Sequence, residues 1–374
     1  MTPILKTEKR YRFINMAEHQ VRLSEKYMLG EKLGAGGTSE VFRATHKRTQ
    51  SKVVIKCMSR RRVSAYDIQQ EVTALVELEH SNIVKLYEII DQQYCEYVYL
   101  VMEYLQGHDL WNYIKNNRVT IMREELGLPE RDVRIIFSQI VKTVSYMHEA
   151  GYAHRDIKGG NVMVADNMKA TLIDFGFTLT QTRYEERYDE RWDGNMNGTP
   201  EFMSPELLTG LQIDLRMSDM WSLGVLLYHM LTSTYPFDNN RGNLLELKQL
   251  IQRGVYTKPH HLSPQACAIL DRLLQVNPDE RATCRELMNH PWLCIDTSEI
   301  YSPTEPIDRE KLDKKCTREM GYMYGIQWMQ MIERVRAWRY DQFTATYLLL
   351  LEKRMKKKEK RPTKKISCFS FLRS

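Results

Sequence analysis

The chain has 374 residues and a formal charge of +6, and 43% of its residues are hydrophobic and 27% charged. This composition is typical of a globular protein, and no stretch is apolar for the roughly 18 residues that a membrane span needs. Seven cysteines without a CxxC pair argue against a disulfide framework and a zinc site, and charged residues near the N-terminus argue against a secretory signal, so we expect a cytoplasmic protein without a transmembrane segment.

The first third of the chain reads as a sheet with one helix. Residues 27–58 alternate apolar and β-branched residues with glycine and polar turns, which predicts consecutive antiparallel strands. Residues 67–80 have apolar residues at helical spacing, and residues 83–104 read as two further strands around a polar turn. We therefore expect a five-stranded sheet with one main helix.

The remainder of the chain is predicted to be mainly helical. Apolar stripes at helical spacing recur from Gln106 to Leu293, followed by a polar, proline-containing segment and a last helical region. The fold class expected is α+β, with a small β-rich lobe, a large helical lobe and a small helical module. The predicted divisions are an N-terminal extension (1–26), a main domain (27–293), a linker (294–315), a helical module (316–352) and a basic tail (353–374).

A glycine cluster and a strand lysine are the first residues that could carry chemistry. In LGAGGTSEV, amides of a turn between two strands could close over nucleotide phosphates, although such a turn is often just a tight hairpin. Lys56 ends the apolar run VVIK, and Glu71 lies beside the apolar stripe of the following helix, so the two could pair. The alternative is a surface lysine and a solvated glutamate.

The stretch HRDIKGGNVMV and the following LIDFGF bring oxygen ligands and a cation close together in sequence. Phosphoryl transfer needs oxygen ligands for Mg²⁺, a carboxylate for the proton of the attacking hydroxyl, and a cation against the migrating phosphate. These residue types occur in that stretch as Asp156, Lys158, Asn161 and Asp174.

Over residues 27–293 the chain resembles the eukaryotic protein kinase superfamily. The motifs that match are GxGxxGxV at Gly34, Gly36 and Val41, the strand lysine, the helix glutamate, HRDxKxxN and DFG. GTPEFMSPE, DMWSLGV and an arginine, Arg281, expected to pair with Glu206, extend the match. The lysine of HRDxK and the GTPEF element resemble serine/threonine kinases.

The resemblance implies ATP and Mg²⁺ as cofactors and a role for each matched residue. Lys56, held by Glu71, would grip the α- and β-phosphates; Asp156 would accept the hydroxyl proton, and Lys158 would neutralise the γ-phosphate. Asn161 and Asp174 would hold Mg²⁺. The implied nucleotide contacts are Leu33, Gly34, Ala35, Gly36, Gly37, Val41, Val54, Lys56, the gatekeeper Met102, the hinge residues Glu103 and Leu105, and Met163.

The chain departs from the family pattern at three places near the expected nucleotide and switch sites. Ser39 replaces the third loop glycine, and Val54 stands where alanine is usual and narrows the adenine pocket. Asn195 occupies the place of the usual regulatory threonine. Acidic residues of the activation segment could supply the anion for Arg155 instead, or another residue of that segment could be phosphorylated: Thr178, Thr180, Thr182, Tyr184 or Tyr188.

Residues 320–350 resemble the ubiquitin-associated-like (UBA-like) domain of the AMP-activated-kinase-related family, especially its microtubule-affinity-regulating branch, on MGY at 320–322 and YDQFTATYLLL at 340–350. That resemblance implies packing on the kinase with little ubiquitin binding; the alternative is a helical pair extending the core. Residues 353–365 carry nine Lys or Arg against one Glu, a net of +8, so the rest of the chain sums to 6 − 8 = −2. This tail could contact acidic lipid or other polyanions, direct nuclear import, or be solvated.

Taken together, the residues favour a non-specific serine/threonine protein kinase acting on protein substrates. The alternative is a pseudokinase or scaffold that binds nucleotide without efficient transfer, which the complete set of catalytic residues disfavours. Asp109 and the acidic activation segment suggest substrates with basic residues before the acceptor hydroxyl. Oligomeric state is not predicted by any feature of the sequence.

Overall fold

The computed structural model describes residues 20–37, 39–92, 95–121, 124–125, 127–182, 185, 199–209, 214–238, 243–294 and 307–359. The chain divides into two compact units. One, the sheet unit, combines residues 1–62, 87–104 and 308–374; the other, the helical unit, combines residues 63–86 and 105–307. The expected mixed fold of a β-rich part, a helical part and a C-terminal helical module is confirmed.

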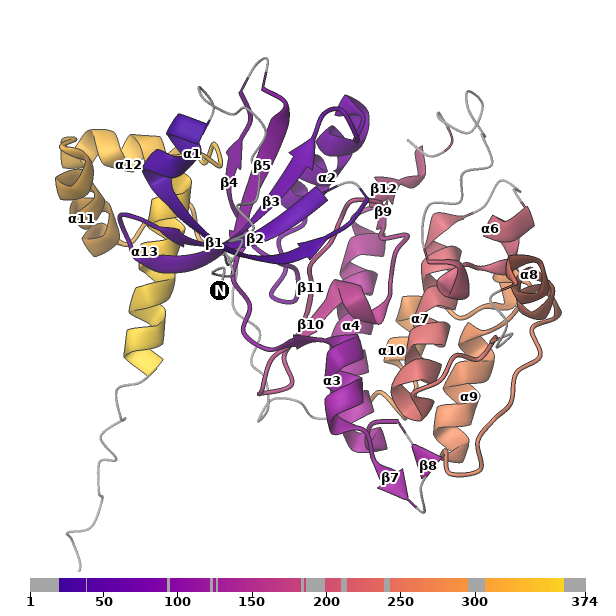
Figure 1. Cartoon of the computed structure of the whole chain (residues 1–374). Helices are drawn as coiled ribbons and strands as arrows, with labels where there is room; N and C mark the ends of the chain where they lie inside the picture. The colour runs from indigo at the N-terminus through magenta and orange to yellow at the C-terminus, as the bar shows by residue number, and fades with distance from the viewer. Residues whose placement is uncertain are drawn as a thin grey trace, which may run out of the picture. The chain divides into compact units, whose positions relative to one another are not determined.

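The sheet unit contains the predicted five-stranded sheet, and its strand order is β1-β2-β3-β5-β4 (Figure 1). The β1–β2, β2–β3 and β3–β5 pairs are antiparallel. A short helix, α1 (Gln20–Lys26), precedes the first strand. The strands are β1 (Tyr27–Ala35), β2 (Ser39–His46), β3 (Ser51–Ser59), β4 (Leu86–Ile90) and β5 (Tyr97–Glu103).

The strand register places the expected nucleotide-binding residues on one face of this sheet. Val41 is directly opposite Lys56, and Val54 is directly opposite Met102. Val54 and Lys56 are two residues apart on β3, so all four side chains leave the same face. The sequence suggested that Lys56 ends its strand. Instead β3 continues to Ser59, because Cys57 and Met58 are buried in the ladder.

The three C-terminal helices belong to the same unit as the sheet. They are α11 (Lys314–Tyr324), α12 (Trp328–Arg336) and α13 (Gln342–Glu359), and their own core includes Met320, Met331, Val335 and Tyr347.

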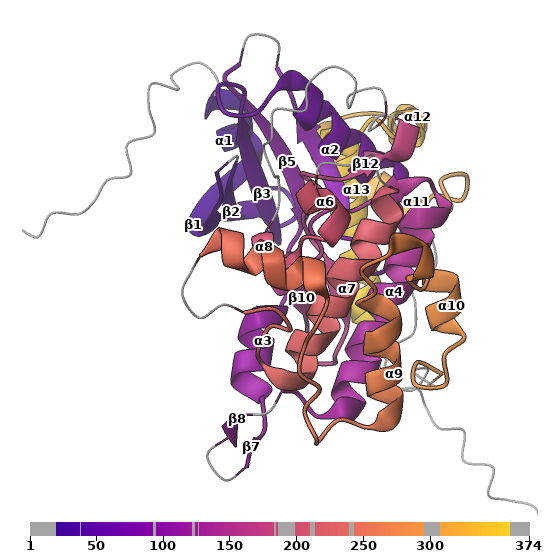
Figure 2. The same ribbon diagram turned by 90° about the vertical axis from the view of Figure 1, so that its right-hand side faces the viewer.

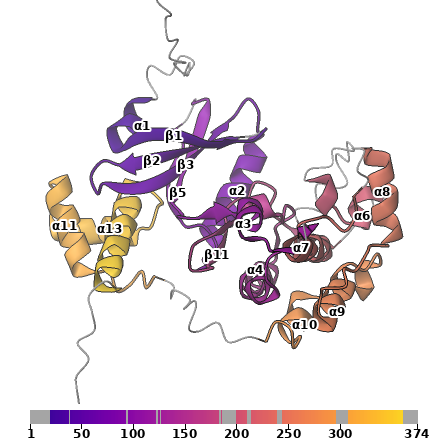
Figure 3. The same cartoon turned by 60° about the horizontal axis from the view of Figure 1, so that its bottom comes forward.

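The C-terminal helices also contact the strands (Figure 3). The Tyr87 hydroxyl donates to the Glu352 carboxylate at 2.8 Å, and the Ile89 amide donates to the Tyr340 carbonyl at 2.8 Å. The Arg48 guanidinium lies 4.2 Å from the centroid of the Tyr324 ring. Polar contacts and an aromatic contact therefore attach the helices to the sheet.

A buried histidine at the end of β2 gives this unit a pH-dependent stability. The His46 side chain is 1% exposed and hydrogen-bonds to Thr49 Oγ1 at 2.8 Å. Burial, and then the nearby Arg48, Lys26 and Lys353 charges, lower the pKa of His46 from 6.5 to about 4. As the pH falls, His46 therefore binds a proton in the unfolded chain before it does so in the folded chain. The contribution of neutral His46 to the free energy of unfolding is complete above pH 6.5 and is lost towards pH 4.

We expect the free energy of unfolding to decrease by about 3 kcal/mol over this pH range because of His46. The measurement is urea unfolding at pH 7 and pH 4.5 for the wild type and for His46→Asn, which keeps a polar atom near Thr49 but does not titrate. The variant should show the smaller loss of stability on acidification. Equal losses in the two proteins would contradict the assignment.

In the helical unit α4 packs against α7 and α10, and α7 also packs against α9 (Figure 2). Its helices are α2 (Ala65–Glu77), α3 (Leu110–Asn117), α4 (Glu130–Glu149), α6 (Pro205–Thr209), α7 (Leu215–Thr232), α8 (Leu244–Arg253), α9 (Pro264–Leu273) and α10 (Cys284–Met288), with 3₁₀ turns η1 (Gly159–Asn161), η2 (Pro200–Phe202) and η3 (Pro278–Glu280). Trp221, Trp292, Phe137 and Phe237 are fully buried in it.

Short strands of the helical unit position its loops. β10 (Val162–Val164) pairs with β11 (Ala170–Leu172) and β6 (His108–Asp109), and β9 (Tyr152–Ala153) pairs with β12 (Leu179–Thr180). The long segment after α3 contains a small β7–β8 pair (Thr120–Ile121 and Glu124–Glu125). None of the described helices combines the length and apolar character that crossing a lipid bilayer requires.

Candidate active site

The catalytic loop of the expected kinase motif lies in the helical unit between β9 and β10. Asp156 is 7% exposed, and its Oδ2 lies 2.8 Å from Lys158 Nζ. Asn161 donates through Nδ2 to the same Oδ2 at 2.7 Å and to the Asp156 carbonyl at 2.8 Å. Lys158 Nζ also donates to Thr199 Oγ1 of the GTPEF element at 3.0 Å. The loop thus brings three of the predicted residues together around one carboxylate.

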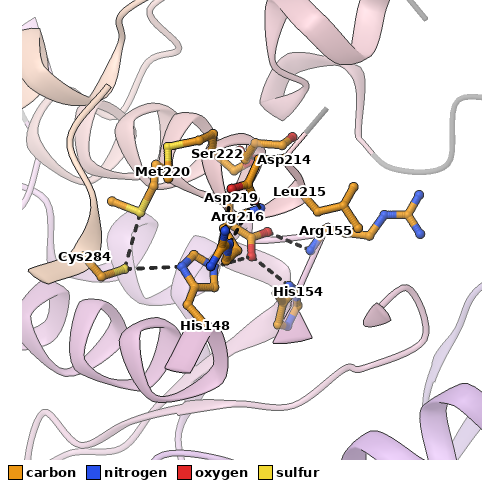
Figure 4. A network of polar contacts seen from close by, with 12 residues as sticks. His148, His154, Arg155, Asp214, Leu215, Arg216, Asp219, Met220, Ser222 and Cys284 are labelled. Atoms are coloured by element: carbon orange, nitrogen blue, oxygen red, sulfur yellow. Dashed lines mark hydrogen bonds and ion pairs between the residues drawn. The ribbon is translucent and has the colours of Figure 1, made fainter. Parts of the chain in front are cut away.

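The backbone of this loop is fixed by Asp219 on α7, which is fully buried (Figure 4). Its Oδ2 accepts from the His154 amide at 2.8 Å and lies 2.9 Å from His148 Nε2, and its Oδ1 accepts from the Arg155 amide at 2.8 Å. Arg155 has a φ of 68°, a left-handed conformation that costs free energy in a non-glycine residue. Charge-assisted hydrogen bonds to both amides stabilise that turn.

His154 is buried within the catalytic loop. Its Nδ1 accepts from the Asp156 amide at 3.3 Å, and its ring lies 5.4 Å from the Phe175 ring of the DFG motif. Burial lowers the pKa of His154, which favours the neutral ring that this hydrogen bond requires.

Asp174 is positioned beside the catalytic loop by a backbone hydrogen bond of its neighbour. The Ile173 amide donates to the Asn161 carbonyl at 3.1 Å, and Asp174 Oδ1 accepts from the Gly176 amide at 3.2 Å. Because Asn161 donates through its nitrogen, its amide oxygen is left as an acceptor of the kind that Mg²⁺ prefers.

One amide and one carboxylate fit a divalent cation that takes its other ligands from nucleotide phosphates and water. Within the described part of the chain, no group of three or more His, Cys, Asp or Glu side chains is placed to hold a metal by itself.

The predicted pair of Glu206 and Arg281 is present. Arg281 Nη1 donates to Glu206 Oε1 at 2.7 Å and Nη2 donates to Oε2 at 3.1 Å, and the arginine side chain is fully buried. This bidentate pair ties the segment after GTPEF to the loop before α10.

The remaining predicted residues divide between the two units. Gly34 and Ala35 end β1, and the Gly36 amide donates to the Ser39 carbonyl at 2.9 Å, so the glycine cluster does form a turn between two strands. Leu33, Gly37, Val41, Val54, Lys56, Met102 and Glu103 also lie in the sheet unit, whereas Glu71, Leu105 and Met163 lie in the helical unit.

Lys56 is 5% exposed and Glu71 is 4% exposed, so neither is the solvated charge of the alternative interpretation. On α2 the apolar stripe runs through Ile68, Ala74 and Leu75 and includes Glu71 itself, while Val72 and Val76 are half-buried. The pairing of Lys56 with Glu71 stays a prediction.

Much of the activation segment, including Asn195, Tyr184 and Tyr188, lies outside the described residues. Arg155 Nη1 donates to the Phe177 carbonyl at 3.4 Å, and Glu185 is exposed and accepts from Gln181 at 3.0 Å. Activation by acidic residues of this segment stays a prediction.

Asp219 and Trp111 were not predicted as site residues, although both contact the catalytic loop. Asp219 lies within the DMWSLGV motif, which was used only as a family match. The glycine pair in HRDIKGGN is the signal that could have indicated a bulky neighbour such as Trp111.

Comparison with known proteins identifies relatives of both parts of the chain. A family model described as "Protein kinase domain" matches residues 27–293, and one described as "Maternal embryonic leucine zipper kinase, UBA domain" matches residues 312–354. Maternal embryonic leucine zipper kinase of Danio rerio is 33% identical over 344 residues, covering 91% of this chain and 48% of that relative.

Two other relatives are similar over comparable lengths. The Xenopus laevis protein of the same name is 32% identical over 330 residues (88% of this chain, 48% of the relative), and sperm motility kinase 3A of Mus musculus is 31% identical over 345 residues (91% and 64%). The chain spans about half the length of the maternal embryonic leucine zipper kinases that it matches.

The kinase model covers more than half of the chain. The expected AMP-activated-kinase-related relationship with a UBA-like module is also confirmed. The chain therefore belongs to the protein kinase family, whose members transfer phosphate from ATP with a divalent metal, and it carries a UBA domain of the maternal embryonic leucine zipper kinase type.

Proposed function

We propose that the chain transfers the γ-phosphate of ATP to serine or threonine hydroxyls of protein substrates. The observation that carries the proposal is the arrangement of Lys158 and Asn161 around the Asp156 carboxylate, together with the contact from Lys158 to Thr199. Lysine in HRDxK and threonine in GTPEF support serine/threonine rather than tyrosine specificity.

Asp156 is the proposed base. Its Oδ2 is fixed by two donors, Asn161 Nδ2 and Lys158 Nζ, so the carboxylate can orient the acceptor hydroxyl and take its proton. Lys158 Nζ lies 2.8 Å from that carboxylate and is proposed to stabilise the negative charge that develops on the migrating phosphoryl group. Lys56, held by Glu71, is proposed to grip the α- and β-phosphates from the sheet unit.

The proposed cofactors are ATP and Mg²⁺. Asn161 and Asp174 offer one amide oxygen and one carboxylate, a donor set that suits Mg²⁺ when phosphate oxygens complete its shell. When bound, the metal would neutralise charge on the phosphates and hold them in place. The glycine turn, the sheet face around Val54, and the residues Leu105 and Met163 are the proposed nucleotide contacts.

The test is transfer from radiolabelled ATP to a generic basic protein by the wild type, Asp156→Ala and Asp166→Ala. Asp166 is an exposed aspartate just after β10, so its replacement is a matched control for loss of a carboxylate. Asp156→Ala should remove transfer and Asp166→Ala should retain it. Wild-type protein that binds ATP but transfers no more phosphate than Asp156→Ala would instead indicate a pseudokinase or scaffold.

Substrates with basic residues before the acceptor remain our proposal for specificity. Asp109 Oδ1 accepts from the Asn112 amide at 3.0 Å and so caps α3, which leaves its charge available but its position fixed. Asp109→Asn keeps an N-cap acceptor and removes the charge. We expect kcat/KM for an arginine-containing peptide to fall about 3- to 10-fold relative to its neutral analogue, measured with matched peptide pairs; an unchanged ratio would exclude Asp109 as a specificity residue.

We also propose that the UBA domain acts by contact with its own sheet unit rather than by binding ubiquitin, which its hydrogen bonds to β4 support. The basic residues from Lys353 onward are proposed to contact acidic lipid or other polyanions. The proposed location is the cytoplasm. The basic residues are proposed to direct part of the protein to the nucleus or to membrane surfaces.

A further inference from the structure

Two adjacent glycines form the middle of the catalytic loop. Gly159 and Gly160 open the 3₁₀ turn η1, directly between Lys158 and Asn161. Neither glycine has a positive φ, so the backbone conformation alone does not call for glycine at these positions. The reason must therefore lie in the space around them.

That space is filled by the indole ring of Trp111 on α3. A Cβ atom added at Gly159 would lie 2.4 Å from Trp111 Cδ1 and 2.7 Å from its Nε1. A Cβ atom added at Gly160 would lie 2.7 Å from Cζ3 of the same ring. The five-membered ring thus covers one glycine and the six-membered ring covers the other, so a side chain at either position would require the ring or the loop to shift.

Trp111 is held in this position by its own element. β6 pairs with β10, with Asp109 opposite Met163, and Asp109 then caps α3, so the first turn of the helix lies against the chain just before β10. Trp111 Nε1 is buried and has no hydrogen-bond partner among the described residues. The ring therefore contributes packing rather than a polar contact.

We propose that Trp111 is a positioning residue for phosphoryl transfer: its ring and the Gly159–Gly160 pair form a matched set that fixes the spacing of Lys158 and Asn161 around Asp156. This inference rests on the proposed function. Lys158 and Asn161 bond to the same carboxylate oxygen from either end of the glycine pair, so a shift of that turn moves both donors away from Asp156.

The decisive experiment introduces Gly159→Ala in two backgrounds and measures kcat and KM for ATP and for a protein substrate. In the otherwise wild-type protein the new methyl group meets the ring, and we expect kcat to fall about 10- to 100-fold with KM for ATP changed less than about 3-fold. In Trp111→Ala the ring is absent, and the same glycine substitution should change kcat less than about 2-fold.

Single substitutions at Trp111 separate positioning from general stability. Trp111→Ala should lower kcat about 10-fold, and Trp111→Phe, which retains a ring over Gly159, should recover most of that loss. Lys115→Ala on the exposed side of the same helix is the control and should leave both constants unchanged. Melting temperatures of all variants identify any loss that comes from unfolding.

The proposal is overturned if Trp111→Ala keeps the wild-type kcat, or if Gly159→Ala lowers kcat equally in both backgrounds. It is also overturned if kcat falls only in proportion to the folded fraction. These results differ from failure of the proposed function, in which wild-type protein itself transfers no phosphate. In that case Gly159→Ala should still lower the melting temperature more in the otherwise wild-type protein than in Trp111→Ala. Equal decreases in the two backgrounds would reject the matched set.

Discussion

Replacing Arg281 by methionine is expected to lower the free energy of unfolding by about 3–5 kcal/mol. The arginine side chain is fully buried, and its partner Glu206 is 7% exposed, so the substitution leaves an unpaired carboxylate in the interior. The guanidinium also donates to the carbonyls of Gln275 at 2.9 Å and Met217 at 2.5 Å, and these acceptors lose their donor as well. Urea unfolding of the wild type and the variant measures the difference.

Two comparisons test the cause of that loss. The double variant Glu206→Leu with Arg281→Met removes both charges and should recover most of the stability, because the attraction of a buried pair is largely offset by its desolvation cost. Arg272→Ala breaks a surface pair with Glu286, whose side chains are about half exposed (47% and 50%), and should cost less than about 1 kcal/mol. A double variant as unstable as Arg281→Met would contradict the explanation.

The clustering of Asp156, Lys158 and Asn161 could be predicted from the sequence because phosphoryl transfer restricts the residue types and their order. Asp156, Lys158 and Asn161 are close in the chain, so the same short loop that carries the motif also brings them within hydrogen-bond distance. The sheet was predictable for a similar reason: apolar and β-branched runs separated by glycine and polar turns are a local signal of consecutive strands.

Contacts between distant segments were not predictable in the same way. Tyr87 and Glu352 are separated by 265 positions, and a single tyrosine and glutamate leave no periodic signal that links them. Attachment of the UBA domain to β4 rests on such isolated polar contacts, including the backbone bond between Ile89 and Tyr340. Trp111 was not predicted because it packs against Gly159 and Gly160. These residues have no side chains, so they give no sequence signal of a reactive group.

The second large effect is expected for Asp219→Ala, which should lower kcat about 100-fold and the free energy of unfolding by about 2–5 kcal/mol. The substitution leaves the amides of His154 and Arg155 without their acceptor, and the left-handed turn at Arg155 loses the bond that stabilises it. Asp156 follows that turn directly, so its carboxylate is displaced from Lys158 and Asn161. Steady-state kinetics well below the melting temperature measure the first effect and urea unfolding the second.

Asp214→Ala on the same helix is the matched control. Asp214 caps α7 and accepts from the Arg216 amide at 2.9 Å, and among the described residues it has no hydrogen bond to the catalytic loop (Figure 4). Its loss should therefore cost about 1 kcal/mol and leave kcat within about 2-fold. Hydrogen exchange adds a local test, because the His154 and Arg155 amides should lose protection in Asp219→Ala and keep it in Asp214→Ala. Normal kcat in Asp219→Ala would mean that the loop holds Asp156 in place without the hydrogen bonds from α7.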